Sequence, residues 1–510
     1  FSGSTFGGMG CSFADSDNDG FSDFVSASDL ILYKNNKNNT FSCIDSENDN
    51  ACSGTALPVS SFSGKGIQFF DYNNDSFVDI WAPDTNGARI FKNNGKNNFS
   101  LVSLGADSID EYTAVADYNN DGKLDVFAVD GTSHIIYRNL GSGSFSSINP
   151  STIGLPANTR GSGENAEDFH WAFGDYDNDG DLDIFITSTG ITEKNFFENN
   201  GDGTFTDKTT ASGLPSTDEG TDPVWGDYNN DGYLDLLIGG LALYENDKDG
   251  TFTDKTSDVN LGRIPDAVEF FDFDNDGDLD IIGQNKSGVT IFYRNDLNGL
   301  SYLDIIVNGL GNTSYHNFSN KQAIGAKIDV YNSTNNLICH REISGGEGYG
   351  QAPKIVHCGL SSTNTYTVNV TFPSGIKKVR SVTPSDESFT IGSNTLLDTI
   401  EINESDNSPN ISLSSPPAVF TDTDGSVEFI CNATDDIDLV NLSLVVNTTG
   451  SLVVNQTLNL NTNADTSNQT NFTISSIPTG AVLLWNCLAY DAFGNLGLAQ
   501  ENRTLTIGTG

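Results

Sequence analysis

A nine-residue acidic loop occurs six times within the first 280 residues of this 510-residue chain. Its first copy, 15–23, reads Asp-Ser-Asp-Asn-Asp-Gly-Phe-Ser-Asp, and the other copies begin at Asp71, Asp117, Asp175, Asp227 and Asp272. Every copy has an oxygen-bearing side chain at positions 1, 3, 5 and 9, and position 6 is Gly except for Ser76 in the second copy. Ca²⁺ takes about six to eight oxygen ligands, and Gly allows the backbone to reverse where a Cβ would clash.

These loops predict up to six Ca²⁺ sites. We expect side-chain ligands at positions 1, 3 and 5, a backbone carbonyl at position 7 and, by analogy with helix-flanked calcium loops, a bidentate carboxylate at position 9. For a single copy a metal-free Asp-Gly hairpin turn is the alternative, but six copies favour the metal. The predicted ligands are Asp15, Asp17, Asp19, Phe21, Asp23, Asp71, Asn73, Asp75, Phe77, Asp79, Asp117, Asn119, Asp121, Lys123, Asp125, Asp175, Asp177, Asp179, Asp181, Asp183, Asp227, Asn229, Asp231, Tyr233, Asp235, Asp272, Asp274, Asp276, Asp278 and Asp280.

Short runs of β-forming residues flank the loops, as in 124–129 and 182–187, so each loop is predicted to close a β-hairpin rather than to join two helices. The loops start 56, 46, 58, 52 and 45 residues apart. Periods of about 40–50 residues built from short strands are typical of a propeller with one four-stranded blade per repeat. The fold class is therefore predicted to be all-β.

The rest of each repeat supports this architecture. An aromatic strand ending in a turn, as in 90–95, is followed by a Gly-x-Phe strand, and 203–209 recurs almost verbatim at 250–256. Residues 1–299 thus resemble the FG-GAP/VCBS repeat family, the calcium-loop propellers that include integrin α-chains. The six motifs predict a six-bladed propeller, or a seven-bladed one, as in integrin-type propellers, if one blade lacks the loop. Residues 1–6 are expected to supply the last outer strand and close the ring.

Two further domains are predicted after the propeller. Residues 300–402 resemble the ASPIC/UnbV domain through 320–326, 343–350 and 357–360, with Phe372 where that family usually has Trp, and a small β-rich domain is implied. Residues 403–510 contain alternating strands with Cys431 and Cys487 on two of them, which predicts an immunoglobulin-like β-sandwich with an inter-sheet disulfide. This segment resembles modules of prokaryotic, especially archaeal, surface glycoproteins.

Composition excludes some classes and places the chain outside the cell. The net charge of −45 excludes a nucleic-acid binder, which needs a basic footprint. The chain contains no run of 18 apolar residues, so no membrane span is predicted. The chain begins at Phe1, so a signal segment is expected to have been removed. Local spacing predicts three disulfides, which are typical of an oxidising compartment: Cys43 with Cys52, Cys339 with Cys358 and Cys431 with Cys487. Cys11 remains and is expected to be a buried thiol.

Asn-x-Ser/Thr sequons are dense and indicate a secreted glycoprotein. They concentrate in the last hundred residues, so the predicted sandwich is expected to be heavily N-glycosylated. The sequon asparagines are Asn38, Asn98, Asn285, Asn312, Asn317, Asn332, Asn369, Asn403, Asn410, Asn432, Asn441, Asn447, Asn455, Asn468, Asn471 and Asn502.

Nothing in the sequence requires catalysis. The histidines lack metal-ligand spacing, His170 is expected to be a packed strand residue, and a glycan-cleaving enzyme is a remote alternative that depends on Glu164, Glu167 and Asp168. We therefore predict a non-enzymatic, calcium-stabilised surface glycoprotein with a structural or adhesive role that self-assembles into a filament or surface layer. Its partners would be neighbouring subunits and cell-surface glycans or proteins. The alternative is a propeller lectin that presents exposed Trp81, Trp171 and Trp225 to glycans.

Overall fold

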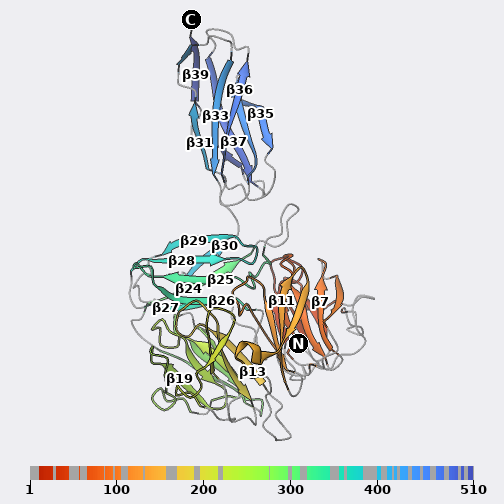
Figure 1. The fold of residues 1–510 in the computed structure, drawn as a ribbon, viewed down its shortest axis with the longest axis vertical. Coiled ribbons are helices and arrows are strands. Elements are labelled where there is room, and N and C mark those ends of the chain that lie inside the picture. The colour runs from red at the N-terminus through yellow and green to blue at the C-terminus, as the bar shows by residue number, and fades with distance from the viewer. Residues whose placement is uncertain are drawn as a thin grey trace. The chain divides into compact units, whose positions relative to one another are not determined.

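The computed structural model divides the chain into two compact units, one formed by residues 1–312 and 317–404 and the other by 313–316 and 405–510 (Figure 1). Each unit is described by itself. The structure describes residues 11–26, 30–44, 57, 66–84, 87–95, 98–104, 109, 113–129, 133–156, 169–188, 196–215, 222–262, 264–274, 276–285, 287–296, 301–309, 319–344, 355–360, 364–382, 399–403, 410–415, 419–421, 426–434, 439–447, 452–459, 467–475, 482–491, 496–498 and 503–508.

Six antiparallel sheets in the N-terminal unit each contain one copy of the acidic loop, which joins the first two strands of its sheet. We number the loops 1 to 6 and give the same number to the repeat around each loop. Repeats 1 to 5 have four strands in sequential order, and repeat 6 has three among the described residues. The strands are β1 Cys11–Ala14, β2 Asp23–Ser26, β3 Ile31–Asn35, β4 Phe41–Cys43, β5 Gln68–Phe70, β6 Asp79–Asp84, β7 Gly87–Asn93, β8 Phe99–Ser103, β9 Ala114–Ala116, β10 Asp125–Val129, β11 His134–Gly141, β12 Ser144–Ile148, β13 Phe169–Gly174, β14 Asp183–Ser188, β15 Phe196–Asn199, β16 Phe205–Asp207, β17 Pro223–Gly226, β18 Asp235–Ile238, β19 Ala242–Asn246, β20 Phe252–Asp254, β21 Ala267–Phe271, β22 Asp280–Gln284 and β23 Thr290–Tyr293.

After its initial Asp, the strand that follows each loop is mainly apolar, and in repeats 3 and 5 it is covered on both faces. All five residues of β10 are buried, and so are all four of β18. Packing continues from one repeat to the next: Tyr118 of loop 3 lies edge-on to Phe127 of its own repeat and stacks on Phe205 of repeat 4. The described residues contain a single short helical turn, Pro150–Ile153, so the predicted all-β, propeller-type class is confirmed. The number of blades stays a prediction, because residues 1–6 lie outside the described residues.

A second group of strands, which we call the β24–β30 module, belongs to the same unit. Its strands form two sheets, ordered β27-β24-β30 and β26-β25-β28-β29, and Cys339 and Cys358 form a disulfide between β26 and β27. Its apolar side chains share one hydrophobic core cluster with repeats 1 to 3. The strands are β24 Ser301–Asn308, β25 Lys327–Tyr331, β26 Leu337–Glu342, β27 Ile355–Leu360, β28 Tyr366–Thr371, β29 Lys377–Val382 and β30 Thr399–Asn403.

The C-terminal unit is also made of two sheets. One has the order β31-β33-β36 and the other β32-β39-β37-β34-β35, with β38 paired to β37. A disulfide joins Cys431 on β33 to Cys487 on β37, as predicted for an inter-sheet bridge, and Phe429 packs edge-on against Trp485 nearby. The immunoglobulin-like identity and the exact domain boundaries stay predictions. The strands are β31 Asn410–Ser415, β32 Val419–Thr421, β33 Ser426–Thr434, β34 Leu439–Asn447, β35 Leu452–Asn459, β36 Ser467–Ser475, β37 Val482–Asp491, β38 Leu496–Leu498 and β39 Arg503–Gly508.

Candidate metal centre

The first aspartate of each loop holds the turn closed. In loop 1, the two carboxylate oxygens of Asp15 accept hydrogen bonds from the backbone N–H groups of Asp19, at 2.9 Å, and Gly20, at 2.6 Å. The equivalent pair of bonds is present in the other five loops. Gly20 has a φ of +92°, a conformation that favours Gly. The repeated Gly at position 6 is therefore explained by the backbone.

The last aspartate of each loop is anchored to the third strand of its own sheet. Its Oδ1 accepts the backbone N–H of an asparagine at or near the end of that strand, at 2.6 Å for Asp125 and 2.8 Å for Asp183. The same bond occurs in all six repeats. The Oδ2 of this aspartate also accepts a hydrogen bond from within the loop in repeats 1 to 4 and 6, whereas Asp235 Oδ2 of loop 5 has no hydrogen-bond partner among the described residues. The predicted bidentate contact at position 9, and the carbonyl contact at position 7, stay predictions.

Carboxylates converge in the three loops that have Asp at position 3. Ligand oxygens lie within 4.8 Å of one another in three groups: Asp15, Asp17 and Asp19; Asp175, Asp177 and Asp183; and Asp272, Asp274 and Asp276. In loops 2, 3 and 5, Asn supplies an amide oxygen at position 3 instead, and that oxygen accepts the N–H of position 5. All side-chain donors at positions 1, 3, 5 and 9 are thus hard oxygens, the ligand type that Ca²⁺ prefers.

Two observations show that these residues fit a divalent cation. Asp17 Oδ1, Asp235 Oδ2 and Asp274 Oδ1 are buried without a hydrogen-bond partner among the described residues, so each can accept a further interaction. Burial and, second, the charges of neighbouring carboxylates raise the pKa of Asp71 and of Asp177 to about 7. Burial above all raises the pKa of Asp125 to about 8. The charged form of these groups is unfavourable without a counter-charge, which a bound Ca²⁺ would supply.

Basic side chains on the third strands contact the fifth loop position in some repeats but not in others. Lys92 Nζ lies 3.0 Å from Asp75 Oδ2, and Arg294 Nε lies 3.2 Å from Asp274 Oδ2 at position 3 of loop 6. Repeats 4 and 5 have Glu198 and Glu245 at the corresponding strand position. These carboxylates accept hydrogen bonds from the tyrosine at loop position 2, at 2.7 Å and 2.8 Å. The sequence analysis missed this difference between basic and acidic residues on the third strands. It is visible in the sequence at the residue that precedes the asparagine at or near the end of the third strand: this residue is Lys92 in repeat 2 but Glu198 in repeat 4.

Each loop also bonds to the next one through its fourth residue. The side-chain N–H of Asn178 in loop 4 donates to the carbonyl of Gly232 in loop 5, at 2.9 Å. The same contact joins loops 1 and 2, 2 and 3, 3 and 4, and 5 and 6. Asn178 has a φ of +60°, which Asn tolerates better than most residues and which is shared by the other position-4 asparagines described, with φ from 52° to 60°. The loops are therefore linked in series.

A second link comes from the asparagine at or near the end of each third strand. In repeat 4, the side-chain N–H of Asn199 donates to the carbonyl of Tyr118 in loop 3, at 2.8 Å, and to that of Leu182 in its own loop, at 3.1 Å. Repeats 2, 3, 5 and 6 have the equivalent pair. We call the asparagines at this position of the six repeats the strand-three asparagines: Asn35, Asn93, Asn139, Asn199, Asn246 and Asn295. The sequence analysis treated them as turn residues and missed their role.

The β24–β30 module contacts the same loops by hydrogen bonds and ion pairs. Gln322 Oε1 accepts the N–H of Asp15 in loop 1, at 2.9 Å. Lys327 Nζ lies 2.6 Å from Asp117 Oδ2 in loop 3. In loop 5, Asp227 Oδ2 accepts the N–H of Gly359, at 3.0 Å. Position-1 residues of three acidic loops therefore also contact the module.

The module also packs closely on loop 6. A Cβ added to Gly277, whose φ is +85°, would lie 1.8 Å from the ring of Tyr302, so this position requires Gly on two grounds. Among the described residues, the module thus contacts loops 1, 3, 5 and 6 directly, and Leu337 approaches Gly180 of loop 4.

Family models match both N-terminal parts of the chain. The FG-GAP-like repeat matches residues 71–128, 117–186, 175–238 and 239–283, and the ASPIC and UnbV model matches 317–397. The chain carries FG-GAP repeats and an ASPIC/UnbV domain. The resemblance inferred from the acidic loops is thereby confirmed, while the archaeal assignment of the C-terminal segment stays a prediction. FG-GAP repeats often bind calcium, and both families are typically non-catalytic.

Solved structures resemble the FG-GAP repeat chain only distantly. A lectin from Agrocybe aegerita, described as recognising non-reducing terminal N-acetylglucosamine, is 21% identical with a TM-score of 0.39, covering 56% of this chain and 81% of its own. The V. cholerae biofilm matrix protein Bap1 is 12% identical with a TM-score of 0.25, covering 87% of this chain and 72% of its own. No curated protein matches the chain.

The disulfides agree with the cysteine pairing predicted for an FG-GAP protein outside the cell. Cys43 is disulfide-bonded, and its predicted partner Cys52 lies outside the described residues. Together with the two resolved bridges and the FG-GAP repeats, this indicates an extracellular protein. No helix in the described residues is long and apolar enough to cross a membrane. Cys11 is unpaired among the described residues but exposed, so the expectation of a buried thiol is wrong.

Several other predicted residues occupy positions that the sequence did not reveal. Trp81 and Trp171 are 0% and 1% exposed, so their expected role as exposed sugar-stacking residues is wrong, and only Trp225 is half-buried. Each indole fills the core between repeats instead. His170 is buried in β13, in line with the interpretation as a packed residue. Glu164, Glu167 and Asp168 lie outside the described residues.

The sequons differ in accessibility where their side chains are described. Asn38 and Asn98 are exposed, and Asn332, Asn369 and Asn432 are half-buried. Asn285 is buried, and its Oδ1 accepts the N–H groups of Ser287 and Val289, both at 3.0 Å. Its amide is thus already part of a turn, which disfavours glycan attachment there.

Proposed function

We propose that the chain is an extracellular, calcium-stabilised structural glycoprotein whose FG-GAP repeats form a rigid platform for self-assembly. The observation that carries this proposal is the series of linked loops. Six loops of oxygen donors are joined to one another by the position-4 and strand-three asparagines. A bound cation at one loop would therefore stiffen its neighbours as well.

The chain's own residues set up this stiffening. The position-1 carboxylate holds the turn, the position-9 carboxylate fixes the loop to the third strand, and the two asparagines tie it to adjacent loops. Bound Ca²⁺ would supply the positive charge that these clustered carboxylates lack. No atom of this arrangement needs to move for a reaction, which supports a structural rather than a catalytic or regulatory role.

Self-assembly is supported by the surface of the last repeat. Phe273 and Phe292 of repeat 6 are 44% and 57% exposed, and their rings lie 6.5 Å apart. The sheet that carries them has three described strands instead of four. An aromatic face beside an incomplete sheet is a site that residues 1–6 of the same chain or a neighbouring subunit could cover. Ring closure by residues 1–6 remains the arrangement we favour, with contacts between domains joining successive subunits.

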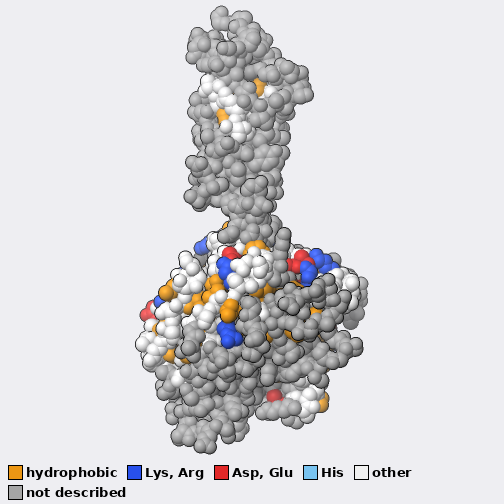
Figure 2. Space-filling view, turned by 90° about the vertical axis from the view of Figure 1, so that its right-hand side faces the viewer, with side chains coloured by type: hydrophobic (Ala, Val, Ile, Leu, Met, Phe, Trp, Pro, Cys, Tyr) orange, Lys and Arg blue, Asp and Glu red, His pale blue; other side chains and the backbone are white. Residues whose placement is uncertain are grey.

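Nucleic acid is not expected as a partner. On the described part of the face shown in Figure 2, Lys and Arg side chains lie singly or in small groups beside acidic ones, and no continuous basic stripe is visible. The chain's net charge of −45 points the same way. The lectin alternative, in turn, has lost two of the three Trp residues on which it rested.

The proposal is tested by imaging purified full-length chain in calcium and after chelation with EGTA. We expect ordered filaments or sheets in calcium, and loss of order when it is removed. Isolated monomers under both conditions would contradict self-assembly. Binding to a glycan array at submicromolar affinity, lost in Trp225→Ala and not in Trp81→Phe, would favour the lectin instead.

A further inference from the structure

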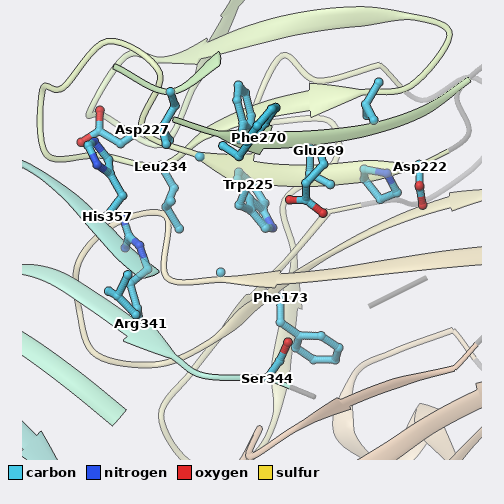
Figure 3. A pocket seen from close by; sticks show the side chains of 18 of the residues that line it. Phe173, Asp222, Trp225, Asp227, Leu234, Glu269, Phe270, Arg341, Ser344 and His357 are labelled. Carbon is cyan, nitrogen blue, oxygen red and sulfur yellow. The ribbon is translucent and has the colours of Figure 1, made fainter. Parts of the chain in front are cut away.

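A cavity lies within the N-terminal unit beside loops 4 to 6, and the position-1 residues Asp227 and Asp272 are among its lining residues. Its volume is about 820 Å³, and it is bounded by the first strands of repeats 3 to 6 and by β26 and β27 of the module (Figure 3). This is the size range of small-molecule sites, roughly 300–1,000 Å³. Nothing proposed above for the loops requires this cavity.

The wall of the cavity is mainly apolar and aromatic. Figure 3 places Trp225 and Phe270 side by side at its middle, with Phe173 across from them. Arg341 and His357 lie toward one end, and Glu269 and Asp222 toward the other. Only two hydroxyl side chains, Ser344 and Thr290, are among its described lining residues. Such a wall suits a flat apolar body better than a sugar, whose hydroxyl groups would need many polar partners.

Donor groups without partners face this space. Arg341 Nη1 donates to the carbonyl of His340, at 2.8 Å, whereas its Nη2 is buried and has no hydrogen-bond partner among the described residues. The same is true of Nε1 of Trp171, a side chain that is 1% exposed. A buried cation or N–H group left unpaired is costly, so these atoms mark where a ligand group is expected.

Three of the acidic groups that line the cavity have other partners. Asp222 is paired with His170, at 3.0 Å, and Asp304 with His357, at 2.8 Å. The carboxylate of Asp227, which favours the charged form of Arg341, accepts N–H groups of its own loop and of Gly359. The guanidinium forms no ion pair with a carboxylate in the described residues.

We propose that the cavity binds a small organic carboxylate with a flat apolar body. The carboxylate would accept hydrogen bonds from Arg341 Nη2, and the apolar body would lie against Trp225 and Phe270. Arginine suits this role because its planar guanidinium matches a carboxylate. The aromatic wall contributes affinity by burying apolar surface.

The test compares two probes of one shape, biphenyl-4-carboxylate and its neutral amide, by calorimetric titration of the full chain in calcium. We expect one site and at least about tenfold tighter binding of the carboxylate. Arg341→Met should abolish the preference while leaving the affinity for the amide unchanged, and Arg341→Lys should keep part of it. Arg380→Met, which removes an exposed arginine of the same module, is the matched control and should change nothing.

Failure of either comparison overturns the inference. If neither probe binds, the cavity is a water-filled space. If the carboxylate binds equally well to the Arg341→Met variant, the guanidinium is not its partner. Should that variant fail to fold by circular dichroism, quenching of tryptophan fluorescence by the two probes in the unmodified chain and in Trp225→Phe decides: equal quenching by both probes contradicts the proposal. Loss of calcium binding or of assembly would affect none of these outcomes as long as the chain stays folded.

Discussion

Repeats 2 to 4 and repeat 6 contain nearly the same loop, yet the second residue of the loop has different surroundings in them. In loops 2, 3 and 4 this residue is a tyrosine that packs on the Gly-x-Phe phenylalanine of the following repeat, as Tyr118 does on Phe205 and Tyr176 on Phe252. Tyr118 and Tyr176 are 2% and 3% exposed. The equivalent Phe273 of loop 6 is 44% exposed, because no described strand of a following repeat covers it.

The difference shows that a repeat is completed by its neighbour. Apolar surface at loop position 2 is a benefit only when the next Gly-x-Phe strand covers it, so stability is shared between adjacent repeats, as in other repeat arrays. The asparagine links follow the same rule, since each spans two repeats. The last repeat consequently presents a face that no strand among the described residues covers. Experiments that remove calcium, aromatic packing or asparagine links should therefore affect interior and terminal repeats unequally.

Removal of calcium should have the largest effect. Each site that binds only the folded state adds about 2.7 kcal/mol at a hundredfold excess of free ion, and several sites add together. We expect EDTA to lower the melting temperature of the N-terminal unit by on the order of 10 °C or more. Differential scanning calorimetry measures this, and the melting of the C-terminal unit, which lacks the loops, is the internal control. An unchanged melt after thorough chelation would sink the structural role of calcium.

Truncation of the position-2 aromatic residue separates interior from terminal repeats most directly. Tyr176→Ala removes a buried ring and its hydrogen bond to Glu198, and should cost about 3–5 kcal/mol. Phe273→Ala removes an exposed ring and should cost within about 0.5 kcal/mol in the isolated monomer. Urea unfolding of both variants in calcium is the measurement. A large cost for Phe273→Ala in a monomer would show that another part of the same chain covers this face, as ring closure by residues 1–6 requires.

The asparagine link provides the next comparison. Asn199→Ala deletes two buried hydrogen bonds to backbone carbonyls and leaves both without a donor, so we expect a loss of about 2–3 kcal/mol. Asn295→Ala in repeat 6 should cost less, because the side chain is half-buried and water can replace the lost donor. Asn200→Ala is the matched control, since this adjacent residue is exposed. Equal losses at 199 and 200 would contradict the proposed link.

Features of the fold and of the loops could be predicted from the sequence where they depend on a local or repeated sequence pattern. The loops, their flanking strands and two disulfides were predictable because each depends on residues close in sequence or on a repeated spacing. The strand-three asparagines were not, because their acceptors are backbone carbonyls, as Tyr118 is for Asn199, and carbonyls leave no signature in the sequence. For the same reason no pattern in the module indicated that Gly359 would bond to Asp227, which lies 132 residues earlier.

Exposure was the other quantity that the sequence could not supply. Trp171 lies on the first strand of its sheet and Trp81 on the second strand of its own. Both positions are compatible with an exposed sugar-stacking residue or with a core residue. Packing between adjacent sheets decides for the core: Trp171 contacts Phe127 of the preceding repeat, with ring centroids 5.4 Å apart. Such contacts depend on the angle between sheets, which periodicity does not specify.

The pH dependence of the calcium-free chain should differ between loops. Asp125 has a folded-state pKa of about 8, above its unfolded value, because it is buried. The folded state therefore binds more protons, so this stability is present at low pH and lost as the pH rises through about 8. In EDTA, we expect the melting temperature to rise by a few degrees, roughly, as the pH falls from about 8 to about 6.5.

Substitutions identify the groups responsible for that slope. Asp125→Asn should reduce the change of melting temperature with pH near pH 8. Asp276→Asn in loop 6 should leave the change near pH 8 as it is, because the pKa of Asp276 is raised only to about 6. In excess calcium the slope should disappear or reverse, since protons then compete with the ion. Melting curves across pH, with and without calcium, test this, and a rise of stability with pH in EDTA would contradict it.

The smallest effect concerns loop 2, the one loop in which position 6 is not Gly. Ser76 has a φ of +75°, is fully buried and has an Oγ without a hydrogen-bond partner among the described residues, so its side chain is unfavourable on two counts. Ser76→Gly should stabilise the chain by about 1 kcal/mol and strengthen the calcium site of loop 2, which is otherwise expected to empty first. The reverse exchange in loop 3, Gly122→Ser, is the matched control: its φ is +79° and an added Cβ meets nothing within 4 Å, so its cost would come from the backbone alone. Calcium titrations and melts of both variants should move in opposite directions by similar amounts. If Ser76→Gly changes neither, the positive φ is not what weakens loop 2, and the amide at Asn73 becomes the remaining difference from the loops with Asp at position 3.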